Sequence, residues 1–420
     1  MDAAQQQLSI REVMQIPAFR RLWLGQLVSL LGDFLALFAV LSYASFKLHA
    51  TAAQVTFISV AFLVPFAFFG PIAGVFVDRW DLKRTMIASD LIRAALIFVL
   101  IFVPNLYGIY AILLALSFVS TFFIPAQSVT MRTLVPANGL LSANAVMQQA
   151  MQVIRIFTPA LAGALVAWFG AYVCYIIDGS SFLFSALMIA PLVIRREQAS
   201  AAAPGKTTVG SVVSELGAGA KFIFTHASIL FVIVAITAGM FAISCFGPLL
   251  AVYVRDNLKT NEVVFGAVNS LVGVGMIVCT LLIGKFAQSR SKTHMVIEGL
   301  MIMGISVALM AAFGNVAMAS VAMFGIGVGA ALLMIPSQTL IQAETPMEMV
   351  GRVSSSVWSL MSVAQVVGLI FSGSLAVRLG IVKLFYLSAA MLVIIAVVGY
   401  FRLMARPPQV APAQVSETEQ

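Results

Sequence analysis

The sequence predicts an all-α membrane protein with twelve transmembrane helices in two pseudo-symmetric six-helix bundles. Of its 420 residues, 61% are hydrophobic and only 10% are charged, and the mean hydropathy is +1.04. A soluble domain carries about 25% charged residues. The apolar runs show no two-residue alternation, which argues against a transmembrane barrel. Since one crossing takes roughly 20 helical residues, the length suits about a dozen crossings.

Apolar runs separated by short polar turns place the helices along the chain. The first run is too long for a signal-peptide core, so we expect it to stay as the first helix. The expected domains are an N-terminal bundle at 1–194, a cytoplasmic linker at 195–225 whose pattern suits an amphipathic helix, a C-terminal bundle at 226–403 and a disordered cytoplasmic tail at 404–420. The expected helices span 20–46, 52–77, 84–105, 107–132, 141–168, 171–194, 226–254, 262–288, 293–314, 316–341, 351–377 and 380–403.

The basic residues set the expected orientation. The net charge is +8, and most lysines and arginines fall in one set of loops, which the positive-inside rule places in the cytoplasm. We therefore expect a multi-pass protein of the inner (plasma) membrane with both termini cytoplasmic. This placement explains the positive charge without a nucleic-acid partner.

The two halves repeat each other at an offset of about 210 residues. Pro125-Ala126-Gln127 matches Pro336-Ser337-Gln338, and Gly163 matches Gly373. Phe169-Gly170 matches Leu379-Gly380, and Gly74 matches Gly284. Such parallel repeats are typical of transporters whose halves surround a central route.

A dense group of charges separates the second and third expected helices. Gly74 to Arg84 reads GVFVDRWDLKR, which we interpret as a short cytoplasmic turn. It resembles the G-x-x-x-D-R-x-x-[RK]-[RK] signature of the major facilitator superfamily, and Gly284–Lys292 is a weaker second copy in which Gln288 replaces the acid. The resemblance implies the major facilitator fold and secondary transport.

Other segments are similar to the macrolide-efflux-like and siderophore-exporter-like branch of that superfamily. One motif departs from the drug antiporters of the superfamily: Thr158–Gly163 matches their G-P-x-x-G-G only weakly. The segments that carry the similarity are Phe19–Trp23, Ser29–Asp33, Ser89–Ala94, Asp178–Phe182 and Gly247–Tyr253.

The resemblance also implies a gate at the inner surface. Asp78 would contact the start of the eleventh helix when the inner side is closed, because a helix N-terminus attracts a carboxylate. The alternative is that the basic residues are only topology signals. The expected gating residues are Gly74, Asp78, Arg79, Lys83, Arg84, Asp90, Arg93, Arg132, Gly351 and Arg352.

We place three charges in mid-membrane within the expected helices: Asp33, Arg155 and Asp178. Each costs about 2.5–3.5 kcal/mol on insertion scales. Asp33 and Arg155 fall at similar depths, so we expect them to meet and to couple proton binding to conformational change. The alternative is a permanent ion pair that positions two helices. Asp178 is a further coupling candidate, or a structural residue bonded to Ser180 or Ser181.

Methionine, phenylalanine and glutamine side chains mark the expected substrate route. Flexible thioethers and aromatic rings suit varied hydrophobic ligands, although ordinary packing explains most of them. The expected substrate-binding residues are Gln26, Phe123, Gln127, Gln148, Met151, Met240, Phe241, Asn269, Met334, Gln338, Met361 and Gln365.

These patterns favour a proton-coupled antiporter for multidrug efflux of a hydrophobic or amphipathic compound. The alternatives are a siderophore, lysophospholipid or metal-ion transporter, and a non-transporting receptor or scaffold. The expected partners are a small-molecule substrate, protons and membrane lipids, with no cofactor, and the chain is expected to be a monomer. The sequence holds no G-x-x-x-x-G-K-[ST] phosphate loop, so we expect a gradient rather than ATP to drive transport. It also shows no nucleophile–base arrangement and no metal-ligand spacing of its cysteines, so we expect no enzymatic activity.

Overall fold

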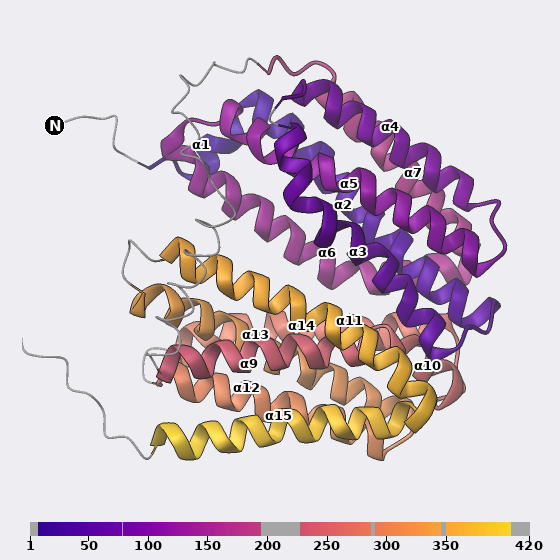
Figure 1. Cartoon of the computed structure of the whole chain (residues 1–420), viewed down its shortest axis with the longest axis vertical. Helices are drawn as coiled ribbons and strands as arrows, with labels where there is room; N and C mark the ends of the chain where they lie inside the picture. The colour runs from indigo at the N-terminus through magenta and orange to yellow at the C-terminus, as the bar shows by residue number, and fades with distance from the viewer. Residues whose placement is uncertain (1–6, 78, 195–226, 287–289, 346–349, 405–420) are drawn as a thin grey trace, which may run out of the picture.

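The computed structural model describes residues 7–77, 79–194, 227–286, 290–345 and 350–404, and these are almost entirely helical (Figure 1). The helices form two groups, one from each half of the chain. The first half contains α1 (Ile10–Gln15), α2 (Pro17–Ser42), a π-helical turn (Tyr43–Lys47), α3 (Ala52–Val77), α4 (Leu82–Leu100), α5 (Leu106–Leu134), α6 (Leu140–Phe169) and α7 (Ala171–Ile189). The second half contains α9 (Ala227–Phe246), α10 (Leu249–Asp256), α11 (Glu262–Phe286), α12 (Lys292–Ala312), α13 (Val316–Glu344), α14 (Val350–Leu379) and α15 (Ile381–Met404).

Each of the twelve predicted spans coincides with helix in the structure. The seventh span is interrupted at Gly247-Pro248, which separates α9 from α10. The third predicted span corresponds to α4, which ends at Leu100, five residues before the predicted end. Nine helices of the described residues are long and apolar enough to cross a membrane. The predicted amphipathic helix of the linker and the C-terminal tail lie outside the described residues.

A short helix that the sequence did not predict, α1, packs against the start of α6. Ser9 and Glu12 form a capping box at its N-terminus. The two hydrogen bonds from Ser9 hold the pKa of the Glu12 carboxyl below its usual value. The backbone amide of Leu8 donates to the carbonyl of Asn138 at 3.1 Å. The chain is thereby fixed to the first half before α2 begins.

The repeat found in the sequence is confirmed by the backbone. Gly170 and Gly380 both have φ of +85° and follow the equivalent helices α6 and α14. This left-handed conformation is easy for glycine and strained for other residues. Pro125 and Pro336 lie inside the equivalent helices α5 and α13. The two halves are therefore built to one plan.

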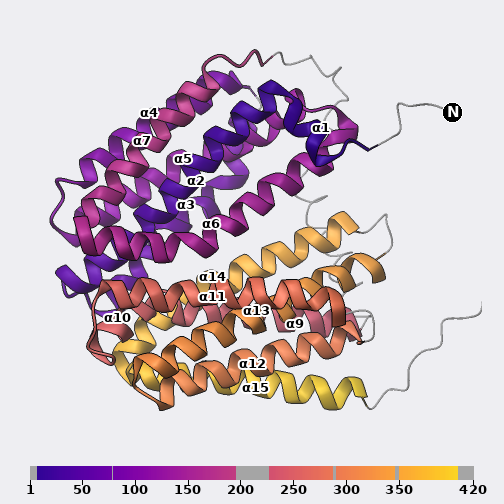
Figure 2. The same ribbon diagram turned by 180° about the vertical axis from the view of Figure 1, so that it is seen from behind.

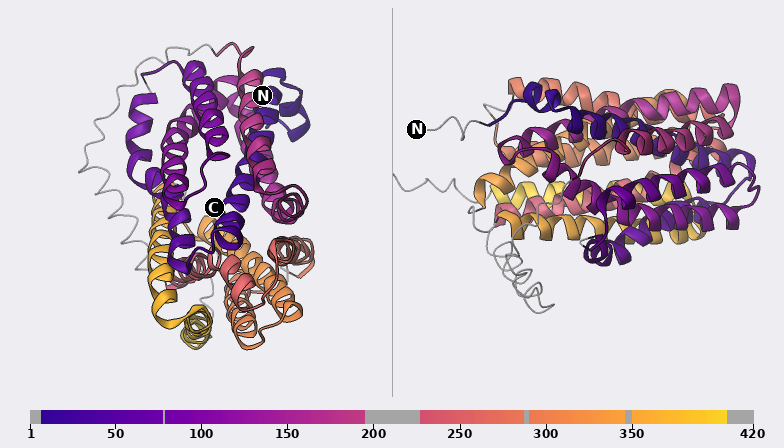
Figure 3. Two further views of the ribbon diagram at one scale, coloured as in Figure 1. Left: turned by 90° about the vertical axis from the view of Figure 1, so that its right-hand side faces the viewer. Right: turned by 90° about the horizontal axis from the view of Figure 1, so that it is seen from above.

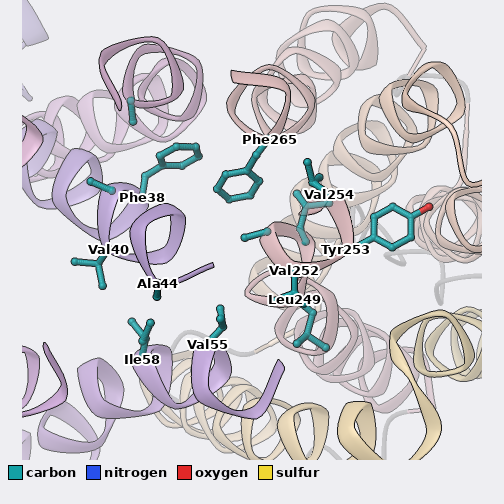
Figure 4. Packing of buried hydrophobic residues seen from close by; sticks show 14 of the residues in the cluster. Phe38, Val40, Ala44, Val55, Ile58, Leu249, Val252, Tyr253, Val254 and Phe265 are labelled. Atoms are coloured by element: carbon teal, nitrogen blue, oxygen red, sulfur yellow. The ribbon is translucent and has the colours of Figure 1, made fainter. Parts of the chain in front are cut away.

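The described contacts between the halves gather at one end of the molecule. We call the end where α1 lies and α15 finishes the terminal end, and the opposite end, near α10, the far end (Figures 1 and 2). Phe38 of α2 stacks on Phe265 of α11 with 4.5 Å between ring centroids (Figure 4). The Arg255 guanidinium donates to the carbonyl of Ser45, and at 3.0 Å to that of Ala50.

Glycines let the halves approach closely at this end. A Cβ on Gly266 of α11 would lie 2.7 Å from the Cα of Gly163 and 2.9 Å from the Pro159 carbonyl of α6. Gly373 of α14 is the repeat partner of Gly163. It lies against α3, where a Cβ on Gly373 would be 3.3 Å from the Cα of Ala53. The matched glycines of the repeat therefore serve the two equivalent contacts between the halves.

The hydrophobic core of the described residues has one cluster shared by the halves and three clusters that each belong to one half. The largest apolar cluster joins both halves and includes Phe38, Val55, Leu250 and Phe265 (Figure 4). A second cluster, around Leu300 and Leu333, belongs to the second half alone. Two smaller clusters belong to the first half. The ribbons of the halves diverge toward the terminal end, and Figure 3 shows the bundle from two further sides.

We expect Gly266→Ala to lower the thermal stability of the purified protein, because the added methyl group meets backbone atoms of α6. Overpacking of this kind costs about 1–3 kcal/mol. Thermal unfolding in detergent measures the change. The control is Gly314→Ala, whose Cβ would meet no atom within 4 Å. Equal melting temperatures for the two variants would contradict the close approach of α6 and α11.

Candidate functional site

Four charged side chains meet inside the first half. Asp33 comes from α2, Asp90 and Arg93 from α4, and Asp178 from α7. Asp90, Arg93 and Asp178 are 0%, 5% and 2% exposed, whereas Asp33 is half-buried. The charge of Arg93 acts on all three carboxylates. We call these four residues the charged cluster.

Arg93 is held on several sides. Its guanidinium pairs with Asp90, one helical turn earlier on α4. Its Cζ atom lies 4.4 Å from the ring centroid of Phe123 and 4.3 Å from that of Phe182. Desolvated cation–π contacts contribute about 2 kcal/mol or more. The cation therefore has a fixed position between α4, α5 and α7.

Small residues bring α2 and α7 together at the cluster. A Cβ on Gly32 would lie 2.9 Å from the Cα of Asp178. The Ser181 hydroxyl donates to the Asp178 carbonyl at 2.7 Å and lies 3.4 Å from its carboxylate. Only glycine at position 32 allows this approach, so the neighbouring Asp33 is positioned by the packing of the two helices.

A small cavity opens between the charges. Its volume is about 20 Å³, and Asp33, Arg93 and Asp178 line it together with Phe62 and Ser120. This volume is enough for one water molecule. Asp90 Oδ2 and Arg93 Nε are buried and have no hydrogen-bond partner. Because buried polar atoms are rarely left unpaired, the site is suited to ordered water or a mobile proton.

The cluster is unbalanced in charge when all its members are ionised. Three carboxylates face one guanidinium, which leaves an excess of two negative charges. Burying unpaired charge is costly. Proton binding would reduce the excess.

The structure brings together part of the predicted coupling set. Asp33 and Asp178 are neighbours, and the predicted hydrogen bond from Ser181 to Asp178 is confirmed. The side chain of Arg155 lies outside what the structure describes, so its pairing with Asp33 stays a prediction. The described cation beside Asp33 is Arg93.

The structure corrects the predicted position of Asp90 and Arg93. The sequence grouped them with charges at the inner surface, but the structure places both in the buried cluster. The reason is the start of α4 at Leu82: at 1.5 Å per residue, Asp90 lies about 12 Å inside the helix. Their spacing of three residues in an otherwise apolar run was the signal that could have revealed them.

The predicted gate is only partly visible. Asp78 lies outside the described residues, and Gly74, Gly351 and Arg352 are helical with undescribed side-chain surroundings. Asp81, which the sequence did not single out, caps α4 by accepting from the Arg84 amide at 2.7 Å. The latch therefore stays a prediction. The remaining basic gating residues are exposed or half-buried at the terminal end: Arg79, Lys83, Arg84 and Arg132.

The predicted substrate residues are spread over both halves. Phe123 is buried beneath Arg93, and Met240, Met334 and Met361 pack against the core of the second half. None of the twelve lines the small cavity of the charged cluster. The exposed members are Gln148, Met151 and Gln338, and the half-buried members are Gln26, Gln127, Phe241, Asn269 and Gln365.

Metal coordination finds no support in the described part of the chain. In that part, no group of three or more histidine, cysteine, aspartate or glutamate side chains is arranged to hold a metal ion. Gln26, predicted to contact substrate, donates instead to Ser185 at 3.3 Å. Ser185 also lies beside Asp90, so Gln26 belongs to the surroundings of the charged cluster.

The two-bundle fold is that of a membrane transporter. The profile of the Major Facilitator Superfamily matches residues 22–360 and 232–419. The chain belongs to this superfamily, as the charge motif at Gly74–Arg84 predicted. It is a multi-pass membrane transporter.

Several bacterial proteins are similar over nearly their whole length. The MFS-type transporter YfiS of Bacillus subtilis is 25% identical over 92% of this chain and 94% of its own. Macrolide efflux protein A of Streptococcus pyogenes is 26% identical over 90% and 94%. The multi-drug resistance efflux pump PmrA of Streptococcus pneumoniae is 23% identical over 90% and 93%.

Solved structures share the fold. The nucleoside transporter NupG superposes with a TM-score of 0.69 at 14% identity, over 93% of this chain and 100% of its own. A bacterial homologue of the iron transporter ferroportin superposes with a TM-score of 0.70 at 15% identity, over 93% and 100%. The fold is thus shared by transporters whose sequences have diverged widely.

We expect Arg93→Gln to destabilise the protein strongly, because it leaves buried carboxylates without their cation. Breaking a buried ion pair costs about 3–5 kcal/mol. Adding Asp90→Asn should recover part of this loss. Thermal unfolding in detergent measures both variants, and the exposed Arg79→Gln is the control. Equal stability of Arg93→Gln and Arg79→Gln would contradict the role given to Arg93.

Proposed function

We propose that the protein is a proton-coupled exporter that moves a hydrophobic or amphipathic small molecule out of the cell by alternating access. The observation that carries the proposal is the charged cluster, in which three carboxylates share one guanidinium inside the first half. The macrolide and multidrug efflux functions printed for two relatives support the class of cargo.

Asp33 is the proposed proton carrier. It is the half-buried member of the cluster and lines the small cavity. When Asp33 is ionised, it attracts Arg93 and competes with Asp90. When a proton neutralises Asp33, Arg93 is left to Asp90 and Asp178, and the attraction between α2 and α4 weakens. Proton binding thus changes the forces between helices at one defined place.

Helix α2 connects this place to the contact between the halves. Phe38, five residues after Asp33, stacks on Phe265 of the second half. The π-helical turn that continues α2 supplies the Ser45 carbonyl that Arg255 binds. At 1.5 Å per residue, Phe38 lies about 7.5 Å along the helix from Asp33. A shift of α2 would therefore reach the far-end contact directly.

The orientation follows from the positive charges at the terminal end, which the positive-inside rule places in the cytoplasm. The far end then faces outward, and this conformation is closed to the outside. The alternating-access cycle would require the far-end contacts to part while the terminal ends approach. Closure there is the step in which Asp78 and the start of α14 would meet.

We expect Asp33→Asn to abolish export driven by a pH gradient, because the side chain can no longer bind and release a proton. The assay is uptake of erythromycin into inside-out proteoliposomes with an imposed pH gradient. Protein level and erythromycin binding should stay close to wild type. Glu298→Gln is the control, since Glu298 is an exposed carboxylate paired with Arg290. Full pH-driven transport by Asp33→Asn would rule out the carrier role.

We expect Arg255→Ala to shift the resting population toward the outward-open state. The substitution removes charged hydrogen bonds across the halves, each of which is worth about 1.5–3 kcal/mol. Spin labels at Tyr107 and Gly314, on opposite halves, report the distance across the far end. Lys259→Ala, another far-end cation, is the control. An unchanged distance distribution in Arg255→Ala would show that this contact does not hold the far end closed.

A further inference from the structure

A second, larger cavity lies at the far end, apart from the charged cluster. Its volume is about 450 Å³, within the range of small-molecule sites. Its walls come from the end of α2 and the π-helical turn, the turn between α4 and α5, the junction of α6 and α7, and the start of α11. The two cavities share no lining residue, although they come close along α2, where Val40 lines the small cavity and Ser42 the large one.

The cavity combines an apolar body with a few polar groups. Leu100, Val103 and Val166 line it together with the aromatic rings of Tyr43 and Tyr175. Ser42 also borders the cavity, but its hydroxyl is buried away from the open space.

Two opposite charges complete the lining. Lys47 ends the π-helical turn of the first half, and Glu262 begins α11 of the second half. No ion pair joins these two among the described residues. A ligand of a single charge would be attracted by one of them and repelled by the other. A ligand that carries both charges is attracted by both.

We propose that this cavity binds a zwitterionic amphiphile. The apolar part of the molecule packs against Leu100, Val103 and Val166, its anionic group faces Lys47, and its cationic group faces Glu262. Two sources share this chemistry: a lipid with a phosphoethanolamine headgroup, and a free amphiphile with an amine and a carboxylate.

The site has a consequence for the transport cycle, and this consequence rests on the proposed function. An occupant that contacts both Lys47 and Glu262 joins the two halves at the far end. It therefore binds this closed conformation better than one in which the halves have parted, and it shifts the population toward the closed state. Binding itself does not depend on transport.

The test measures binding to the purified full chain in nonionic detergent by titration calorimetry. The zwitterionic probes are lysophosphatidylethanolamine and N-dodecyl-β-alanine, and the single-charge probes are lysophosphatidylglycerol and dodecylamine. We expect at least one zwitterionic probe to bind one site at least ten-fold more tightly than either single-charge probe. Binding of the lysolipid alone identifies a lipid headgroup as the source, and binding of N-dodecyl-β-alanine alone identifies a free amphiphile.

Matched variants locate the site. Lys47→Gln and Glu262→Gln should each weaken zwitterion binding about ten-fold, and Ala171→Trp, which fills the cavity, should remove it. Lys259→Gln, an exposed far-end lysine that does not line the cavity, should bind as wild type. Equal affinity for the single-charge probes, absence of zwitterion binding, or unchanged binding in all three cavity variants would overturn the proposal. Failed transport with intact binding would count against the proposed function alone.

Discussion

Among the described side chains, Arg93 is the cation that holds three carboxylates inside the first half, and the arrangement of α2, α4 and α7 depends on it. The side chain pairs with Asp90 and lies between two aromatic rings, so it cannot follow a moving partner far. Gly32 lets α2 approach α7 closely enough for Asp33 to share this cation. A buried group of this kind gives little stability for its desolvation cost, which favours a functional reason for its presence.

Asp33 links the charged cluster to the contact between the halves through α2. Asp33, Phe38 and Ser45 lie in order along α2 and its π-helical continuation, and the last two touch the second half. π-helical turns often occur at functional sites because their geometry departs from the regular helix. The same turn borders the far-end cavity. One continuous element thus connects the proton site, the contact between the halves and the proposed amphiphile site.

The sequence predicted the architecture well because its signals are local. Apolar run lengths located the helices, and the 210-residue offset predicted the paired Gly170 and Gly380, which share one backbone conformation. The site was harder to predict. Asp33 and Asp178 stood out as charges in apolar helices. Asp90 and Arg93 were instead grouped with the charges of the preceding turn, although the expected start at residue 84 already put Asp90 about 9 Å into the helix. Contacts between residues of three helices cannot be predicted from the spacing of residues along one helix.

The central claim is that the charged cluster exchanges protons with the binding of cargo. The most direct measurement is proton release from purified protein in lightly buffered detergent when erythromycin is added, followed with a pH-sensitive dye. We expect release of a proton from wild-type protein and none from Asp33→Asn, with erythromycin binding retained in both. Equal proton release by the two proteins, or binding by the wild type without any release, would contradict it.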